Sequence, residues 1–349
     1  MTVRDIARIA GVSPSTVSIV LNNRAGVSDQ TRKRVLELLD EYGYSSNRRG
    51  ATVAKINGNI CFLKYNDSGL IPEKNDNFIS EIIDTVEVES RKLGYNLILT
   101  TVTSDTLEDT LKLVRSSQTM GVIFLGTCLH EKESRLLTNL NVPLVVIDNY
   151  LPSFNMNCVV MNNAEIVRQA VNYLYKIGHR KIGYVRSKVR INNFNERFAG
   201  FLGALDSHKL ELIPDHLFSV LPGVSDSYED MKAILDTHPE LPGALVCDND
   251  AIAIGAMRAL KDAGLSVPED ISVMGFDDIV SASLIDTPLT TMRVHRVDIG
   301  KWAVKLLIDT IFNPHPNSVK IQTSGTLKVR SSTCQPSLLK REIPSVPAS

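Results

Sequence analysis

The sequence lacks the features that define several protein classes. No apolar run reaches the roughly 18 residues that a membrane-spanning helix needs, and the amino-terminal Met-Thr-Val-Arg-Asp is not a basic stretch followed by an apolar one. The five cysteines are odd in number and scattered, without the spacing of a zinc site. Hydrophobic residues make up 43% and charged residues 22%, an ordinary globular mixture. We therefore expect a folded cytoplasmic protein with reduced thiols and no bound metal.

Motifs of the common enzyme classes are also missing. We find no glycine-rich dinucleotide fingerprint, P-loop, Gly-x-Ser-x-Gly elbow or His-Glu-x-x-His site. The nearest approach, 223–227 (Gly-Val-Ser-Asp-Ser), lacks the second glycine, and we expect a loop there. The histidines are dispersed, and we expect a structural role for His179 at a helix–strand turn. The sequence predicts neither an enzyme nor a cofactor.

Charge is unevenly divided along the chain. The formal net charge is −1, but residues 1–50 hold eight Arg/Lys against five Asp/Glu, which gives that part +3 and the other 299 residues −4. A small basic head on a mildly acidic body indicates that only the head meets nucleic acid. Chance clustering of charge is the alternative at this point.

The first part of the chain has the pattern of three short helices. Thr2 is expected to cap the first, whose apolar residues recur at i, i+3, i+4 and i+7. Gly11 ends that helix, Ser13 caps the second, and Pro14 lies in its first turn, where a missing N–H costs nothing. A third helix begins after Ser28. Three short helices with a tight turn between the first two describe a helix-turn-helix.

One face of the second helix is suited to reading DNA. At 100° per residue, the side chains opposite its apolar stripe are those of Ser15, Ser18, Ile19 and Asn22. An isoleucine at the centre of a solvated face is unusual, whereas in a recognition helix it contacts a thymine methyl group while the polar neighbours bond to base edges or phosphates. A three-helix module that docks on another protein is the alternative.

Residues Val3–Asn22 resemble the headpiece of the lactose/galactose repressor (LacI/GalR) family. The resemblance continues through Val27-Ser28, Thr31-Arg32, Tyr44 and Asn47. It implies that residues 47–58 are a hinge that becomes helical on operator DNA, where paired hinges wedge an apolar side chain into the minor groove. The DNA-binding positions it implies are Thr2, Ser13, Pro14, Ser15, Ser18, Ile19, Asn22, Ser28, Thr31, Tyr44, Asn47, Gly50 and Val53.

Two departures from the family pattern affect DNA binding. Ile19 stands where the family has arginine or another polar residue, so the operator sequence does not carry over. Gly50 and Val53 stand where the family has alanine and leucine, and glycine costs about 1 kcal/mol of helix stability relative to alanine. We expect the hinge to depend more on DNA for its folding, with Arg48 and Arg49 compensating through phosphate contacts. A plain interdomain linker is the alternative.

After Gly58 short apolar runs alternate with amphipathic stretches, which predicts parallel sheets covered on both faces. The expected strands are 60–63, 96–101, 122–125, 144–147, 181–185, 244–247 and 271–276. Helical patterns include 78–93, 163–177, 194–208, 250–263 and 297–312. About 275 residues are too many for one doubly wound sheet, so we expect two lobes.

Several stretches of this body resemble the effector core of the same family, which is similar to periplasmic sugar-binding proteins. They are 178–183 (Gly-His-Arg-Lys-Ile-Gly), 249–257, 267–278 and 288–291 (Pro-Leu-Thr-Thr). The resemblance covers residues 2 to about 332. It predicts an α/β fold in which an N-terminal helix-turn-helix headpiece precedes a two-lobed, periplasmic-binding-protein-like core of parallel sheets. The expected boundaries are a headpiece 1–46, a hinge 47–58, a core 59–333 (lobe 1 about 59–162 and 291–320, lobe 2 about 163–290 and 321–333) and a disordered tail 334–349.

Five positions match the effector-binding residues of that family. Arg197 directly precedes the tripeptide Phe-Ala-Gly. Asp148, Asn249 and Asp277 each follow an expected strand, and Phe78 begins the first core helix. In open parallel sheets ligands bind at the carboxyl ends of the strands. Carboxylates, a guanidinium and an amide match the hydroxyls of a polyol, and an aromatic face covers the C–H side of a sugar ring. Singly, each residue also has a structural alternative as a helix cap, an ion-pair partner or a turn former.

Three further expectations concern the rest of the chain. The segment 64–77, longer than the family's usual loop, is either a cover over the ligand or a solvated insertion. Residues after Cys334 lack apolar periodicity and are expected to be disordered. They contain no leucine heptads that would join dimers into tetramers, so a homodimer is the expected state.

These observations predict a ligand-responsive transcription regulator. We expect a cytoplasmic repressor of a carbohydrate-utilisation operon that binds double-stranded operator DNA, with an affinity that a small sugar changes. A purine-like corepressor is the alternative ligand. A sugar-binding uptake protein is another reading of the core, but it would have no use for residues 1–50, and an α/β enzyme is a third.

Overall fold

The structure is a computed structural model that describes residues 3–21, 26–41, 57–67, 76–314 and 316–336. The chain divides into two compact units, Met1–Lys55 and Ile56–Ser349. Each unit is described by itself below. The predicted hinge, apart from its last two residues, lies outside the described residues, as does most of the 64–77 segment.

The first unit contains the three predicted helices, α1 (Val3–Ala10), α2 (Pro14–Leu21) and α3 (Asp29–Glu41). Their inward faces form a small core, which consists of Ile6, Ala7, Ala10, Val17, Val20, Val35 and Leu39. Gly11 has φ +66°, a left-handed backbone that glycine adopts without strain, and this residue ends α1 as expected. The helix-turn-helix prediction is therefore confirmed for the described part of the unit.

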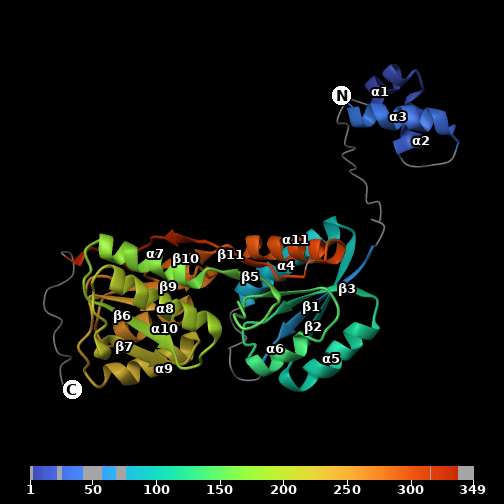
Figure 1. Cartoon of the computed structure of the whole chain (residues 1–349). Coiled ribbons are helices and arrows are strands. Elements are labelled where there is room, and N and C mark those ends of the chain that lie inside the picture. Colours follow the sequence, from blue (N-terminus) through green and yellow to red (C-terminus); the bar gives the residue numbers. More distant parts are fainter. Residues whose placement is uncertain (1–2, 22–25, 42–56, 68–75, 315, 337–349) are drawn as a thin grey trace. The chain divides into compact units, whose positions relative to one another are not determined.

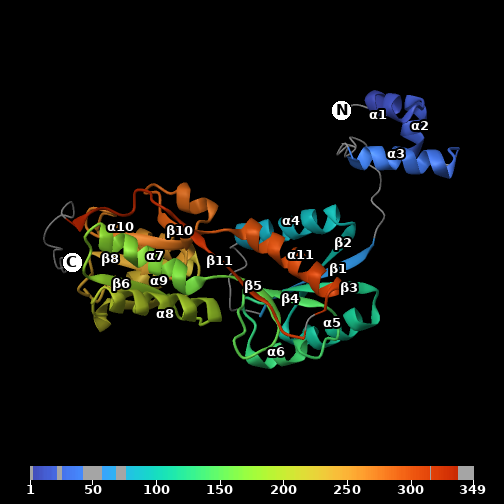
Figure 2. The same ribbon diagram turned by 45° about the horizontal axis from the view of Figure 1, so that its top comes forward.

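The second unit contains two six-stranded sheets (Figures 1 and 2). In spatial order the first sheet consists of β11 (Lys320–Thr323), β5 (Asn157–Met161), β4 (Leu144–Ile147), β3 (Thr119–Leu125), β1 (Gly58–Tyr65) and β2 (Tyr95–Val102). The second consists of β12 (Gly325–Lys328), β10 (Thr290–Val294), β9 (Ser272–Asp277), β8 (Ala244–Cys247), β6 (Ile182–Ser187) and β7 (Leu217–Val220). Neighbouring strands are parallel, except that β10 and β12 are antiparallel.

Helices cover both faces of each sheet, as parallel sheets require. On the first sheet, α4 (Asp76–Lys92) and α11 (Arg296–Phe312) lie on one face, and α5 (Ser104–Ser116) and α6 (Glu131–Leu137) on the other. On the second sheet the corresponding pairs are α7 (Asn163–Lys176) with α8 (Asn192–Ser207), and α9 (Val224–Leu235) with α10 (Asp250–Asp262). We call the first sheet with its helices lobe 1 and the second lobe 2.

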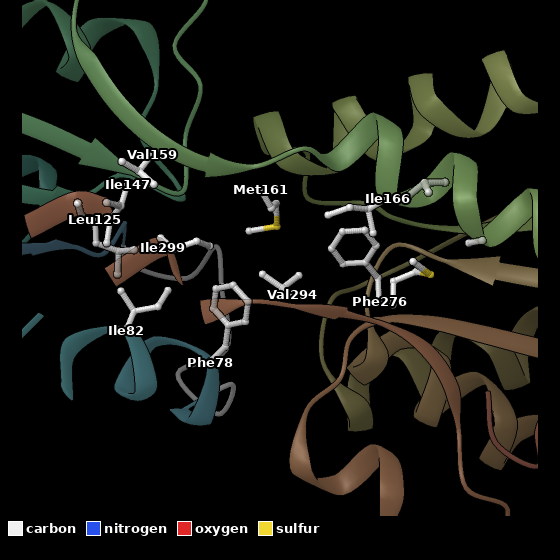
Figure 3. Close-up of a cluster of buried hydrophobic side chains, with 14 of the residues drawn as sticks. Phe78, Ile82, Leu125, Ile147, Val159, Met161, Ile166, Phe276, Val294 and Ile299 are labelled. Carbon is white, nitrogen blue, oxygen red and sulfur yellow. The ribbon is translucent and has the colours of Figure 1, made fainter. Parts of the chain in front are cut away.

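The chain crosses between the lobes three times, after β5, after β10 and between β11 and β12. Two predicted lobe boundaries are wrong by a few residues. Residues 291–294 belong to lobe 2, because β10 pairs with β9, and 321–323 belong to lobe 1, because β11 pairs with β5. Residues 290–294 were not among the expected strands, although threonine and valine favour strands, and nothing in the sequence indicates their pairing with β9. One hydrophobic cluster includes side chains from both lobes, with Met161 and Val294 between them (Figure 3).

Three other expectations need correction. The loop expected at 223–227 is the start of α9, since only Gly223 lies outside the helix, at φ +127°. Gly58, assigned to the hinge, is the first residue of β1. Cys334, assigned to the disordered tail, is anchored to lobe 2, because its N–H donates to Ser272 Oγ at 3.1 Å and its carbonyl oxygen lies 3.0 Å from His179 Nε2. That contact gives the buried His179 the structural role predicted for it.

In the described part of the chain, no helix is long and apolar enough to cross a membrane.

Candidate functional site

A cavity of about 440 Å³ lies between the two lobes. Its lining includes all five predicted effector positions, which come from different elements: Phe78 from α4, Asp148 after β4, Arg197 from α8, Asn249 after β8 and Asp277 at the end of β9. The strand order explains why residues so distant in sequence meet, because the carboxyl ends of parallel strands share one edge of each sheet. The sequence-based prediction thus identified residues that the fold brings together.

Arg197 is the best connected of these residues. Its side chain is buried, and its Nε donates to Asn163 Oδ1 at 2.9 Å while Nη1 donates to the carbonyl oxygen of Asp248 at 2.6 Å. The guanidinium carbon lies 3.6 Å from the centroid of the Phe276 ring, a cation–π contact. Nη2 forms an ion pair with Asp277 Oδ1 at 3.5 Å. This network fixes one orientation of the guanidinium toward the cavity.

Asp277 has an acceptor that no protein group satisfies. Its Oδ1 is buried and has no hydrogen-bond partner, and the 3.5 Å ion pair with Arg197 is not a hydrogen bond. The pKa of the carboxyl group is raised to about 6, chiefly by burial. The charge of Asp148 contributes to this rise, and that of Arg197 opposes it. A buried oxygen without a partner is costly, and it becomes satisfied if a ligand hydroxyl donates to it.

Asp148 belongs to lobe 1 and lines the cavity from that side. It follows β4 with φ +64° and accepts hydrogen bonds from Thr127 Oγ1 at 2.5 Å and from Asn193 Nδ2 at 2.9 Å. Burial raises the pKa of this carboxyl group, although both hydrogen bonds and Arg197 oppose the shift. Asn193 comes from lobe 2, so the Asp148–Asn193 contact joins the two lobes beside the cavity.

The remaining two predicted positions differ in what they offer a ligand. Phe78 presents its ring from the lobe 1 side, and Figure 3 shows it apart from Phe276 on the lobe 2 side. Asn249 caps α10, where its Oδ1 accepts from the N–H of Ile252 at 2.9 Å. Its amide nitrogen is thus the free donor that Asn249 offers a ligand, and Oδ1 keeps one acceptor position.

Sequence reasoning missed several residues of the cavity. Thr127 and Asn193 hold Asp148, and Ser225 and Asp226 reach the cavity from the first turn of α9. Asn193 lies one helical turn before Arg197, and this spacing was the available signal. The α9 residues gave none, because the segment was predicted to be a loop.

In the first unit, α2 has one buried and one open side. Val17 and Val20 are buried, Ser15 and Ser18 are exposed, and Ile19 is partly buried between them. The other described positions among those predicted to bind DNA are Ser13, Pro14, Ser28 and Thr31. The positions outside the described residues are Thr2, Asn22, Tyr44, Asn47, Gly50 and Val53.

Two helix caps of this unit form as predicted, whereas the third, Thr2, lies outside the described residues. Ser13 Oγ accepts from the N–H of Thr16 at 3.1 Å, and Ser28 Oγ accepts from the N–H of Thr31 at 3.3 Å. Each cap satisfies one of the amide groups that a helix leaves open at its start. These N-termini carry partial positive charge, which favours phosphate groups nearby.

Known proteins resemble the chain along almost all of its length. Residues 2–47 match the bacterial regulatory proteins of the lacI family, and residues 171–333 match the periplasmic binding protein-like domain. The ribose operon repressor of Haemophilus influenzae is 30% identical over 334 residues, 95% of this chain and 98% of the relative. A solved complex of the transcriptional regulator CelR with cellobiose has a TM-score of 0.69 at 25% identity and covers 95% of this chain and 99% of CelR. The lac repressor dimer bound to operator and an anti-inducer has a TM-score of 0.70 at 23% identity, with 96% and 99% covered.

Proposed function

Because the chain belongs to the lacI family of bacterial regulatory proteins, we propose that it represses a carbohydrate-utilisation operon and senses a small sugar in the interlobe cavity. The headpiece binds operator DNA, and the lobes change their arrangement when the sugar binds. The coupling is reciprocal, so a ligand that weakens operator binding is itself weakened by operator. Regulation of this kind is not catalysis, and it takes place in the cytoplasm, where the operator is.

The sugar proposal depends on one observation: Oδ1 of Asp277 has no hydrogen-bond partner and lies 3.5 Å from Nη2 of Arg197. A carboxylate accepts hydroxyl protons and a guanidinium donates to hydroxyl oxygens, so the pair suits adjacent hydroxyls of one ring. The Phe78 ring supplies an apolar surface for the C–H face. The related ribose repressor and the CelR–cellobiose complex support a carbohydrate as the ligand class.

A thermal-shift screen with D-ribose, D-galactose, cellobiose, adenosine and hypoxanthine tests this proposal. A ligand at a hundredfold excess over its Kd stabilises the folded chain by about 2.7 kcal/mol, which a melting curve resolves. A hit from hypoxanthine alone would favour the purine-like corepressor. No shift from a broad carbohydrate panel would contradict the sugar proposal.

DNA recognition by α2 predicts different behaviour for two substitutions. Ile19→Ala removes an apolar contact to a base, and we expect the affinity for a duplex selected from random sequences to fall by about 1–3 kcal/mol. Lys33→Gln removes a positive charge from the exposed side of α3, and we expect it to weaken all duplexes alike while lowering the salt slope by about 1. Fluorescence anisotropy on the selected and a scrambled duplex measures both. Equal losses on the two duplexes for Ile19→Ala would argue against base reading by this residue.

We propose that the protein acts as a homodimer through an apolar face that spans both lobes. Its exposed members are Val88 of α4, Leu93 just after that helix, Leu99 of β2, and Val280 and Leu284 in and beside the short helix η2 (Val280–Ser283). The two lobes adjoin on this side, because Glu81 of α4 and Val280 line the same hollow. The apolar side chains of this face suit burial against a second copy.

The dimer proposal predicts a strong effect of one surface charge. Leu284 is 76% exposed, so Leu284→Asp leaves the fold intact but places a carboxylate in the interface. We expect monomers in sedimentation velocity and a loss of operator affinity by a factor on the order of 100 or more, because two linked headpieces bind two half-sites. Leu113→Asp is the matched control, since Leu113 is 69% exposed on α5, on the opposite face of the first sheet. An unchanged dimer in Leu284→Asp would exclude this face.

A further inference from the structure

Arg296 connects groups of both lobes at the rim of the cavity. It is the first residue of α11, directly after the crossover from β10, and only 12% of its side chain is exposed. Its Nε forms an ion pair with Glu81 of α4. Its Nη1 donates to the backbone carbonyl oxygen of Asp277 at 3.0 Å, and Nη2 donates to that of Asp278 at 3.5 Å.

The partners of Arg296 line the cavity or lie next to residues that line it. Asp277 lines the cavity from lobe 2, and Phe78 lines it from lobe 1, one helical turn before Glu81 on α4. The guanidinium carbon of Arg296 lies 5.5 Å from the centroid of the Phe78 ring, within cation–π range. One side chain therefore contacts both walls of the cavity from outside it.

Two other arginines, Arg293 and Arg330, line the same hollow as Arg296 but have different partners. Arg293 and Arg330 both bind the Asp278 carboxylate, and all three residues belong to lobe 2. These two ion pairs stabilise lobe 2 without crossing to lobe 1. Among these three arginines, only Arg296 has partners in both lobes. Its planar guanidinium has five N–H donors, so it serves a carboxylate on one edge and carbonyl oxygens on another, whereas a lysine offers a single charged point.

We propose that Arg296 is a positioning residue that sets the arrangement of the two lobes and transmits cavity occupancy to α4. A ligand that bonds to Asp277 or packs on Phe78 changes the position of a group that Arg296 holds, and Glu81 carries that change to α4. Helix α4 also bears Val88 of the proposed dimer face, and Leu93 follows directly after its last residue. The link to a ligand rests on the proposed function, whereas the effect on the lobes does not.

Spin-label distance measurements on the full chain, without ligand or DNA, test this proposal. Cysteines introduced at Leu113 on α5 and Lys232 on α9, both exposed, carry one label in each lobe. The native Cys61, Cys128, Cys158 and Cys247 are buried, and Cys334 is replaced by serine in this background. Dilution with unlabelled chain leaves the distance within one protomer as the signal.

We expect Glu81→Gln and Arg296→Gln each to shift the interlobe distance by more than ~2 Å, the scale that separates domain rearrangement from side-chain adjustment. Glu87→Gln is the matched control, because Glu87 pairs with Arg91 within α4 and should leave the distance unchanged. In the double variant Glu81→Arg with Arg296→Glu, the ion pair returns but the donors to the Asp277 and Asp278 carbonyls do not. We therefore expect the interlobe distance of this double variant to remain different from that of wild type.

Distance distributions of Glu81→Gln and Arg296→Gln that superimpose on that of Glu87→Gln would overturn the proposal. Recovery of the wild-type distance in the charge-reversed double variant would also overturn it, since the ion pair alone would then set the lobe arrangement. A failure of every sugar in the thermal-shift screen would contradict the proposed function and leave this result standing, because the measurement uses no ligand.

Discussion

Asp277→Asn is expected to gain stability relative to wild type as the pH rises through about 6, and to abolish the response to sugar. The pKa of Asp277 is raised to about 6 from an ordinary value of 3.8, chiefly by burial. The folded chain therefore binds more protons than the unfolded chain between these two values, and this residue lowers stability as the pH rises through that window. A shift of this size corresponds to a cost on the order of 3 kcal/mol above pH 6, which asparagine does not incur.

Urea denaturation followed by circular dichroism at pH 4 and pH 7.5 measures this effect. We expect the stability difference between Asp277→Asn and wild type to move in favour of the variant by about 3 kcal/mol from the lower to the higher pH. Asp236→Asn, an exposed carboxylate of lobe 2, is the control and should show no such trend. A pH-independent difference for Asp277→Asn would mean that the carboxyl group titrates in the ordinary acidic range.

The affinity for sugar should change with pH in the direction opposite to stability, and rise as the pH rises through about 6. The ionised carboxylate accepts hydroxyl protons in charge-assisted hydrogen bonds, each worth about 1.5–3 kcal/mol. For a sugar found in the screen, calorimetry should show affinity falling as the pH drops below about 6, where Asp277 becomes protonated. In Asp277→Asn we expect a loss of about 100-fold or more at pH 7.5. A residue that destabilises the empty protein and binds the ligand illustrates how function is maintained at the expense of stability.

The sequence predicted the cavity well because its residues follow from topology. Asp148, Asn249 and Asp277 stand at or just after strand ends, and parallel strands bring those ends to one edge. Arg197 was found through the following Phe-Ala-Gly, and the structure explains the glycine: a Cβ on Gly200 would lie 2.6 Å from the Cα atom of Ala164. Close packing of α8 on α7 thus requires glycine there, and it places Arg197 one turn earlier at the cavity.

Other elements gave no local signal. The composition of β10 is compatible with a strand, but its membership of lobe 2 follows only from its pairing with β9. Helix α9 begins with Val-Ser-Asp-Ser after a glycine, a composition typical of turns, and becomes helical because its apolar side packs against α10. The contacts of Arg296 with Glu81 and Asp277 join positions that are remote in the sequence, and no periodicity within one element encodes them.

Arg197→Met is expected to have the largest effect on stability. The methionine fills a similar volume, but the buried Asp277 loses its counter-ion, and Asn163 and the Asp248 carbonyl lose their donors. Breaking a buried ion pair from one side costs about 3–5 kcal/mol, and we expect that loss in urea denaturation together with the absence of any sugar-induced thermal shift. Because Arg197 opposes the raised pKa of Asp277, the pKa of this carboxyl group should rise further in the variant.

The double variant Arg197→Met with Asp277→Asn separates the charge contribution from the lost hydrogen bonds. Since asparagine carries no charge to compensate, the double variant should recover a large part of the stability that Arg197→Met loses, while sugar binding stays absent. Arg258→Met is the matched control: its guanidinium lies 4.2 Å from the Tyr228 ring centroid on the exposed side of α10, and its loss should cost about 0.5 kcal/mol or less. If Arg197→Met were no less stable than Arg258→Met, or if adding Asp277→Asn restored nothing, the guanidinium would not be the group that compensates the Asp277 charge.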